Sequence, residues 1–217
     1  MLLAESDVPR LRLSSIEPWD VTPELLALWN DARLCRHLHL PLQSGCAATL
    51  RRMRRKNTVE TYAQSVAEAR RQIPDVSLTT DVIVGFPGES EAEFAETLAY
   101  VERMAFARLH VFVYSRRPGT VANDMPDQVP PQVAQARSEA LIALGQRLAL
   151  AYHTRFVGRE VQVLFEQPEQ TPDGLLWSGL TDNYMRVHVA CAANLHNQLL
   201  RVRCTSADEA GLRGELV

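Results

Sequence analysis

The sequence predicts two successive architectures, an α/β region of parallel β/α units and a small all-β barrel. In the first two-thirds of the chain, strand signals recur about every 30–40 residues with helix signals between them, as in parallel strands joined by crossover helices. After Gly158, short strand signals follow one another without helices, which is typical of a small β-barrel. A long helical stretch lies between the two patterns.

The α/β region is predicted from strand periodicity and helix caps. Thr22 and Thr58 each precede a helical pattern, Pro74 ends the second helix, and Ser90 and Glu93 form a capping box for the third. Four such units are too few to close a barrel, so they form an open sheet or the back of a larger barrel. Right-handed crossovers would place every strand-to-helix turn at one edge, where such folds bind ligands. The predicted strands are 10–15, 37–42, 78–84 and 109–114.

The domain boundaries follow from the change of pattern. We expect a partial barrel over 1–130, a connecting helix over 131–156 and a β-barrel over 157–217. Asp173–Gly174 and Asp182–Asn183 supply turns inside the last region. Its predicted strands are 160–165, 175–180, 184–189, 198–203 and 212–217.

Composition and charge indicate a cytoplasmic globular protein of 217 residues. No apolar run approaches the roughly 20 residues of a membrane span, and the N-terminus lacks the basic and apolar regions of a secretory signal. Four scattered cysteines suggest reduced thiols in place of a disulfide framework. The formal net charge of -3 argues against a generally basic nucleic-acid-binding surface, but it is compatible with a local basic patch.

Two turns at the predicted ligand edge have the composition of binding turns. In the turn from Val84 to Ser90, Gly85 and Gly88 allow close backbone approach, and the following helix start offers N–H groups to an anion. The same residues could equally form a tight turn without a ligand. Gln43 and Ser44 follow the preceding strand and could hydrogen-bond a ribose or a carboxylate, or simply cap a helix.

Basic and imidazole side chains form two further clusters. The run from Arg51 to Lys56 is either a solvated helix end or a cofactor or phosphate contact, and Arg55 is the best candidate for an inward role. Cys35, His37 and His39 share one strand face, but no second pair completes a tetrahedral zinc site. We therefore expect the histidines to line the barrel or to pack.

Nucleotide contacts are predicted at two places. Tyr114 and Arg117 follow the last parallel strand and could stack on a base and pair with a phosphate, or could instead position the second domain. In the β-barrel, Tyr184 and Arg186 offer the same chemistry, and Trp177 is a further stacking platform. Acidic residues are at least as numerous in the barrel, so its charge alone does not indicate RNA binding.

Taken together, four motifs in order resemble the radical-SAM methylthiotransferases over nearly the whole chain. The resemblance is greatest to the type that adds a methylthio group to C2 of N6-threonylcarbamoyladenosine, next to the anticodon of tRNA. The matching segments are Arg10–Pro18, Leu38–Cys46, Thr79–Glu89 and His110–Thr120. The Gln43–Cys46 form and the Arg117–Thr120 loop favour this type over the isopentenyladenosine and ribosomal-protein types.

The resemblance implies a C-terminal portion of such an enzyme: four strands of a radical-SAM barrel and an RNA-binding TRAM barrel. The N-terminal domain and the Cys-x-x-x-Cys-x-x-Cys motif have no counterpart, and Met1–Leu3 resembles the inside of a helix. A [4Fe–4S] cluster that cleaves S-adenosylmethionine needs three closely spaced thiolates. No three of Cys35, Cys46, Cys191 and Cys204 lie close together in the sequence. We therefore expect the chain alone to be inactive.

The resemblance also implies binding residues and partners. Those expected to border S-adenosylmethionine are Ser15, Glu17, Gln43, Ser44, Arg55, Gly85 and Gly88, and those expected to face tRNA are Tyr114, Arg117, Tyr184 and Arg186. Two alternatives stay open. One is a non-catalytic RNA-binding protein, and the other is half of a split enzyme whose missing N-terminal half pairs with an apolar sheet edge near residues 8–15.

Overall fold

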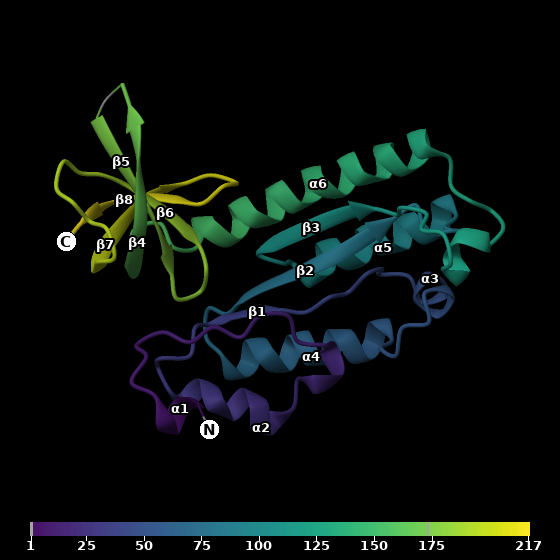
Figure 1. Cartoon of the computed structure of the whole chain (residues 1–217), viewed down its shortest axis with the longest axis horizontal. Helices are drawn as coiled ribbons and strands as arrows, with labels where there is room; N and C mark the ends of the chain where they lie inside the picture. The colour runs from purple at the N-terminus through teal and green to yellow at the C-terminus, as the bar shows by residue number, and fades with distance from the viewer. Residues whose placement is uncertain (1, 173) are drawn as a thin grey trace.

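The computed structural model describes residues 2–172 and 174–217, and it contains both predicted architectures. Figure 1 shows a β-barrel at one end of a layered α/β region, with one long helix running from the sheet into the barrel. No helix of the described residues is long and apolar enough to cross a membrane. The predicted turn residue Asp173 lies outside the described residues, and Gly174 begins a barrel strand.

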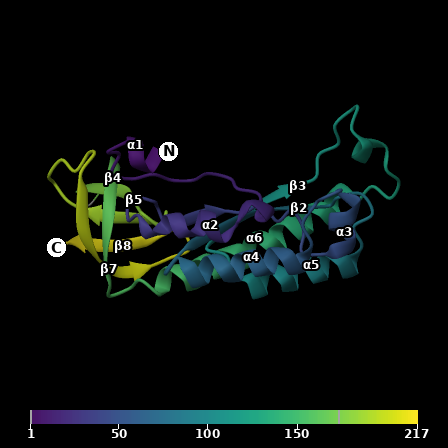
Figure 2. The same cartoon turned by 90° about the horizontal axis from the view of Figure 1, so that it is seen from below.

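A sheet of three parallel strands organises the α/β region, in the order β1 (His37–His39), β2 (Ser77–Val84) and β3 (Arg108–Val113). Three helices cover one face: α4 (Val59–Gln72), α5 (Glu91–Met104) and α6 (Pro131–Thr154). Figure 2 shows these helices on one side of the strands and the extended N-terminal segment on the other. The expected parallel β/α arrangement is confirmed for these units.

The predicted strand over 10–15 is wrong. Only Leu11 forms a ladder contact, as an isolated bridge to Leu34, and Ile16 donates its N–H to the His39 carbonyl at 3.0 Å. Leu11 and Leu13 are only partly buried. The alternation of polar and apolar residues is therefore present, but no core covers the apolar side strongly enough to hold a full ladder. The segment lies as an extended strap beside β1.

The predicted helix caps are confirmed. Thr22 caps α2 (Pro23–Leu26), and Thr58 and Ser90 each form a capping box, with Thr61 and Glu93 respectively. The remaining helices are short: α1 (Leu2–Glu5), η1 (Pro18–Asp20), η2 (Ala27–Asn30), α3 (Ala47–Arg52) and η3 (Val121–Asp124).

Strand alternation gives the sheet two unlike faces. The helix face carries apolar side chains such as Leu38, Leu78 and Val82, which join the core formed with α4, α5 and α6. The open face carries the alternate residues of the same strands and has no helix packed on it among the described residues. Its side chains are His37 and His39 from β1, Thr79 and Asp81 from β2, and Arg108, His110 and Phe112 from β3.

The C-terminal region closes into a five-stranded barrel in the order β4-β5-β6-β8-β7. Its core contains Phe165, Trp177, Val187 and Val202, so the prediction of Trp177 as a stacking platform is wrong. The predicted strand at 184–189 begins later, at Arg186, because Tyr184 has φ +65° and belongs to the preceding turn. The strands are β4 (Glu160–Thr171), β5 (Gly174–Thr181), β6 (Arg186–Ala190), β7 (Leu199–Ala207) and β8 (Leu212–Leu216).

The barrel docks at the N-terminal ends of the parallel strands. Arg36, just before β1, makes two hydrogen bonds to Asp182 at 2.5 and 2.9 Å. Asp75, just before β2, pairs with Arg155 and Arg159, and these arginines hold the pKa of its carboxyl below its usual range. Since α6 also packs on the sheet through Leu141 and Leu144, the predicted connecting helix serves as a layer helix as well.

Candidate ligand site on the open face of the sheet

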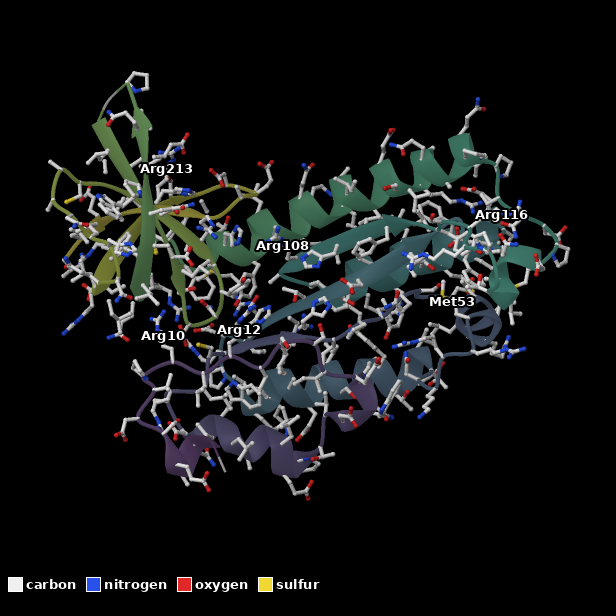
Figure 3. All side chains as sticks on the ribbon, viewed as in Figure 1. Arg10, Arg12, Met53, Arg108, Arg116 and Arg213 are labelled. Carbon is white, nitrogen blue, oxygen red and sulfur yellow. The ribbon has the colours of Figure 1, made fainter. Side chains whose placement is uncertain are left out.

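The open face lines a cleft of about 560 Å³. Arg12, Ser14 and Ser15 of the N-terminal strap and Tyr184 of the barrel complete its walls. Figure 3 shows Arg12 and Arg108 at the end of the sheet nearest the barrel, whereas Met53 and Arg116 lie at the opposite end. A polar, partly cationic hollow on a sheet face is suited to a polar or anionic ligand.

A chain of polar contacts crosses the three strands inside this cleft. Thr79 Oγ1 lies 3.2 Å from His37 Nε2 and 3.0 Å from His39 Nδ1. Asp81 then lies between His39 Nε2, at 3.3 Å, and His110 Nδ1, at 3.2 Å. Burial lowers the pKa of His37 to about 4, so this imidazole is neutral near pH 7.

Alternation in the sequence predicts that His37 and His39 share one face, but it does not single out Asp81 or His110. The signal was present, since Asp81 is the one acidic residue within the strand predicted over 78–84, and a charged group in a buried strand needs partners. His110 alternates with Arg108 and Phe112 in the neighbouring strand. Only the parallel register, which pairs Asp81 with His110, brings the groups together.

The glycine turn after β2 is held rigidly by groups inside the chain. Gly85, with φ +72°, donates its N–H to Glu89 Oε2 at 2.7 Å, and Gly88, with φ +76°, donates to the Asp127 carbonyl at 2.8 Å. A Cβ on Gly85 would lie 2.6 Å from the Ala134 side chain. These N–H groups are therefore bound internally, and the expected anion cradle is not formed by them.

A buried ion pair fixes Glu89 beneath the turn. Arg137 of α6 donates to the Glu89 carboxylate at 2.8 Å and to the Glu89 carbonyl at 3.0 Å. Burial raises the pKa of Glu89, while the Gly85 N–H and the Arg137 guanidinium oppose that rise. No local sequence pattern predicts this ion pair, because Glu89 and Arg137 come from elements far apart in the chain.

The basic run turns two arginines inward, one of them unexpected. Arg55 pairs with Glu17 at 2.6 Å, so two residues predicted to border the cofactor do come together. Arg52 contacts the glycine turn instead, donating to the Pro87 carbonyl at 3.1 Å and to Glu93 at 2.6 Å. Arg52 is the last residue of α3, whereas Arg55 follows the turn at Arg54, which has φ +55°, so the two side chains reach different parts of the chain.

The other predicted edge residues differ in their access to the cleft. Ser15 lines it, and Gln43, with φ +70°, extends the β1–β2 pairing through its backbone. Ser44 is fully buried, and its hydroxyl contacts Thr97 Oγ1 at 3.1 Å and accepts the Cys46 N–H. A direct cofactor contact by Ser44 is not supported, because the hydroxyl faces α5 and no open surface.

The four predicted RNA-facing residues form two groups. Tyr114 and Arg117 line a hollow at the C-terminal end of β3, where the Tyr114 hydroxyl is buried without a hydrogen-bond partner. Tyr184 and Arg186 line a crevice at the N-terminal ends of the strands, beside the barrel. The eight residues of β2 separate the two ends by about 25 Å, so a ligand touching both groups would have to span the cleft.

The cysteines do not fit an iron–sulfur cluster. Burial raises the pKa of the Cys35, Cys46 and Cys204 thiols, which disfavours the thiolate that ligates metal. Among residues 2–172 and 174–217, the group of three potential metal ligands is His39, Asp81 and His110, with no cysteine in it.

The sequence is similar to known proteins along its whole length. Residues 2–101 match the radical SAM superfamily. A tRNA-2-methylthio-N(6)-dimethylallyladenosine synthase from Thermoanaerobacter sp. (strain X514) is 39% identical over 97% of this chain and 45% of its own length. The threonylcarbamoyladenosine tRNA methylthiotransferase MtaB from Bacillus subtilis (strain 168) is 37% identical over 100% of this chain and 49% of its own length. The chain thus spans about half the length of these relatives.

A solved structure supports the fold. The radical SAM enzyme coproporphyrinogen III oxidase (HemN) from Escherichia coli superimposes with a TM-score of 0.54 at 16% identity. The superposition covers 80% of this chain and 46% of the oxidase chain. The three parallel strands with helices on one face therefore belong to a known α/β architecture.

Proposed function

Because the chain belongs to the radical-SAM methylthiotransferase family, we propose that it is the C-terminal part of a tRNA methylthiotransferase. The observation that carries this proposal is similarity over 97% and 100% of the chain to two relatives named for that reaction. The proposed reaction adds a methylthio group to C2 of N6-threonylcarbamoyladenosine next to the anticodon. It takes place in the cytoplasm, where tRNA is modified.

S-Adenosylmethionine is the proposed cofactor, and the C-terminal edge of the sheet is its proposed border. Ser15, Gln43 and the Glu17–Arg55 pair offer hydroxyl, amide and charged groups there. A [4Fe–4S] cluster supplies the reductive cleavage of the cofactor in this family, and the described cysteines do not fit one. We therefore propose that this chain has no turnover by itself and that its cluster-bearing partner is a missing N-terminal half.

The polarity of the cleft supports the threonylcarbamoyl type of substrate. That group carries a carboxylate, and the cleft presents Arg12 and Arg108 together with three histidines. An isopentenyl group would instead need an apolar pocket. Identities of 39% and 37% to relatives of the two types do not separate them, so this assignment rests on the cleft and on the motifs.

The β-barrel is proposed to be a TRAM-like module that contacts tRNA. Tyr184 contacts both the Arg12 guanidinium, 4.1 Å from its ring centroid, and the His37 ring, whose centroid is 4.8 Å away. Arg186 pairs with Glu166 at the exposed surface. Tyr114 and Arg117 are the proposed contacts at the other end of the cleft.

Two assays on the purified chain test this function. With S-adenosylmethionine, a chemical reductant and tRNA containing N6-threonylcarbamoyladenosine, we expect no 2-methylthio product by mass spectrometry. In a binding assay we expect tRNA affinity that falls with salt, and R186Q should reduce both the affinity and the salt slope. R147Q, at an exposed arginine of α6, is the matched control. Turnover by the chain alone, or equal effects of both variants, would contradict the proposal.

A non-catalytic RNA-binding protein is the second candidate, favoured by the cysteine arrangement. It predicts tRNA binding with no affinity for S-adenosylmethionine. Isothermal titration of S-adenosylmethionine into the wild type and an R55Q variant separates the two candidate functions. The methylthiotransferase predicts binding that R55Q weakens, and the non-catalytic protein predicts no binding to either. A split enzyme predicts in addition that the chain captures a cysteine-bearing partner along its N-terminal strap, where Val8 is exposed.

A further inference from the structure

Three side chains from three different positions in the chain converge in the cleft with the chemistry of a metal site. They are His39 of β1, Asp81 of β2 and His110 of β3, and one ligand atom from each lies within 4.8 Å of the other two. Around a first-row ion with bonds of about 2.0–2.2 Å, ligand atoms lie roughly 3–4.4 Å apart. The group therefore needs little movement to surround an ion.

The present contacts leave the ligand atoms facing one another. His39 Nε2 and His110 Nδ1 both point at the Asp81 carboxylate, at 3.3 and 3.2 Å, which is longer than a charge-assisted hydrogen bond. The two imidazole rings are stacked with centroids 5.5 Å apart. Both nitrogens and the carboxylate thus converge on one small volume.

A positioning group already orients the first ligand. Thr79 Oγ1 lies 3.0 Å from His39 Nδ1, on the far side of the ring from Asp81. When Nδ1–H donates to that hydroxyl, Nε2 carries the lone pair that a metal requires. A hydrogen bond to the non-ligating nitrogen is the usual companion of a metal-binding histidine, because it fixes the tautomer and the ring orientation.

We propose that His39, Asp81 and His110 bind one divalent first-row transition-metal ion on the open face of the sheet. Two imidazoles and one carboxylate suit Zn²⁺, Co²⁺ or Fe²⁺, whereas Mg²⁺ and Ca²⁺ prefer oxygen ligands throughout. The Asp81 and His110 side chains are 25% and 41% exposed to the cleft, so further coordination positions face open space. Water or an anionic ligand would fill them, and Arg108 on the same wall favours an anion. The site lies in the cleft proposed to receive the substrate, but binding of a metal ion there requires neither the cysteines nor the proposed reaction.

Titration of Co²⁺ alone into the chelator-stripped chain tests the site. We expect saturation at one Co²⁺ per chain, with visible d–d bands and no near-ultraviolet band from thiolate ligands. D81N and H110Q should each lower the affinity by about 100-fold or more, and T79V by about 10-fold with recovery in T79S. H188Q and H196Q, at histidines of the barrel region outside this group, are the matched controls and should leave the affinity unchanged.

Three results would overturn the proposal. They are no saturable binding at millimolar Co²⁺, a thiolate charge-transfer band, or affinities unchanged in D81N and H110Q. If H110Q does not fold, X-ray absorption of the zinc-loaded wild type decides the question. Two imidazole ligands without sulfur would support the site, and any sulfur scattering would overturn it.

Discussion

The helix face and the open face of the same three strands have opposite chemistry. Leu38 points into the apolar core, while its neighbours His37 and His39 point into the cleft. Val82 and Asp81 divide in the same way on β2. A period of two residues thus separates the side chains that stabilise the sheet from those that can meet a ligand. Stability and ligand chemistry should therefore respond to different substitutions.

The largest expected effect on stability is at the buried Arg137–Glu89 ion pair, which joins α6 to the turn after β2. Arg137→Met would leave the Glu89 carboxylate buried without its partner, and we expect a loss of about 3–5 kcal/mol in the free energy of unfolding. Urea denaturation measures it. Arg147→Met, at an exposed arginine of the same helix, should change stability by less than about 1 kcal/mol. Equal effects at the two positions would contradict this account of the helix face.

The next effect compares the two faces directly. Leu38 is fully buried among the helices, so Leu38→Ala should cost about 2–5 kcal/mol through lost contacts and a cavity. Phe112 is an apolar residue of the open face with 50% exposure, and Phe112→Ala should cost less than about 1 kcal/mol. Thermal denaturation of both variants gives the comparison. A larger loss for Phe112→Ala would mean that the open face also packs against a core.

The pH dependence of stability reports on His37 of the open face. Its pKa is about 4 when folded and near 6.5 when unfolded, so the unfolded state binds the proton first as the pH falls. The contribution of the neutral His37 imidazole to stability is complete above about pH 6.5. It is lost as the pH falls to about 4, which lowers the free energy of unfolding by roughly 3 kcal/mol at most. His37→Gln should flatten this part of the stability–pH curve. An unchanged slope would show that other groups cause the loss of stability at low pH.

The smallest expected effect on stability is at the metal-ligand position His110. Its side chain is 41% exposed, so His110→Gln should change the free energy of unfolding by less than about 0.5 kcal/mol. The same variant should lose Co²⁺ affinity. Chemical denaturation without metal measures the first quantity, and a loss above about 2 kcal/mol would assign His110 a structural role.

Local signals predicted the elements that depend on nearby residues. The caps at Thr58 and Ser90 and the turns and alternation of the β-barrel are short-range features, and their helices and strands lie close to the predicted places. Long-range arrangements were not accessible in this way. The strap at 10–15 has strand alternation without a covering core, and Arg52 faces the glycine turn only because α3 packs beside it.

The candidate site shows the same limit. His37 and His39 could be placed on one face from the sequence, because alternation within one strand is local. Asp81 and His110 join them only through the register of the parallel ladder, which no local pattern specifies. The Glu89–Arg137 pair likewise depends on where α6 lies on the sheet.

The most direct test of the proposed function is the nucleoside content of tRNA from source cells that lack the gene encoding this chain. Mass spectrometry of digested tRNA should show loss of 2-methylthio-N6-threonylcarbamoyladenosine and retention of its unmethylthiolated precursor. The 2-methylthio isopentenyladenosine level should stay unchanged. Unchanged levels of both methylthio nucleosides would contradict the assignment to tRNA methylthiolation, and loss of the isopentenyl form alone would overturn the threonylcarbamoyl assignment.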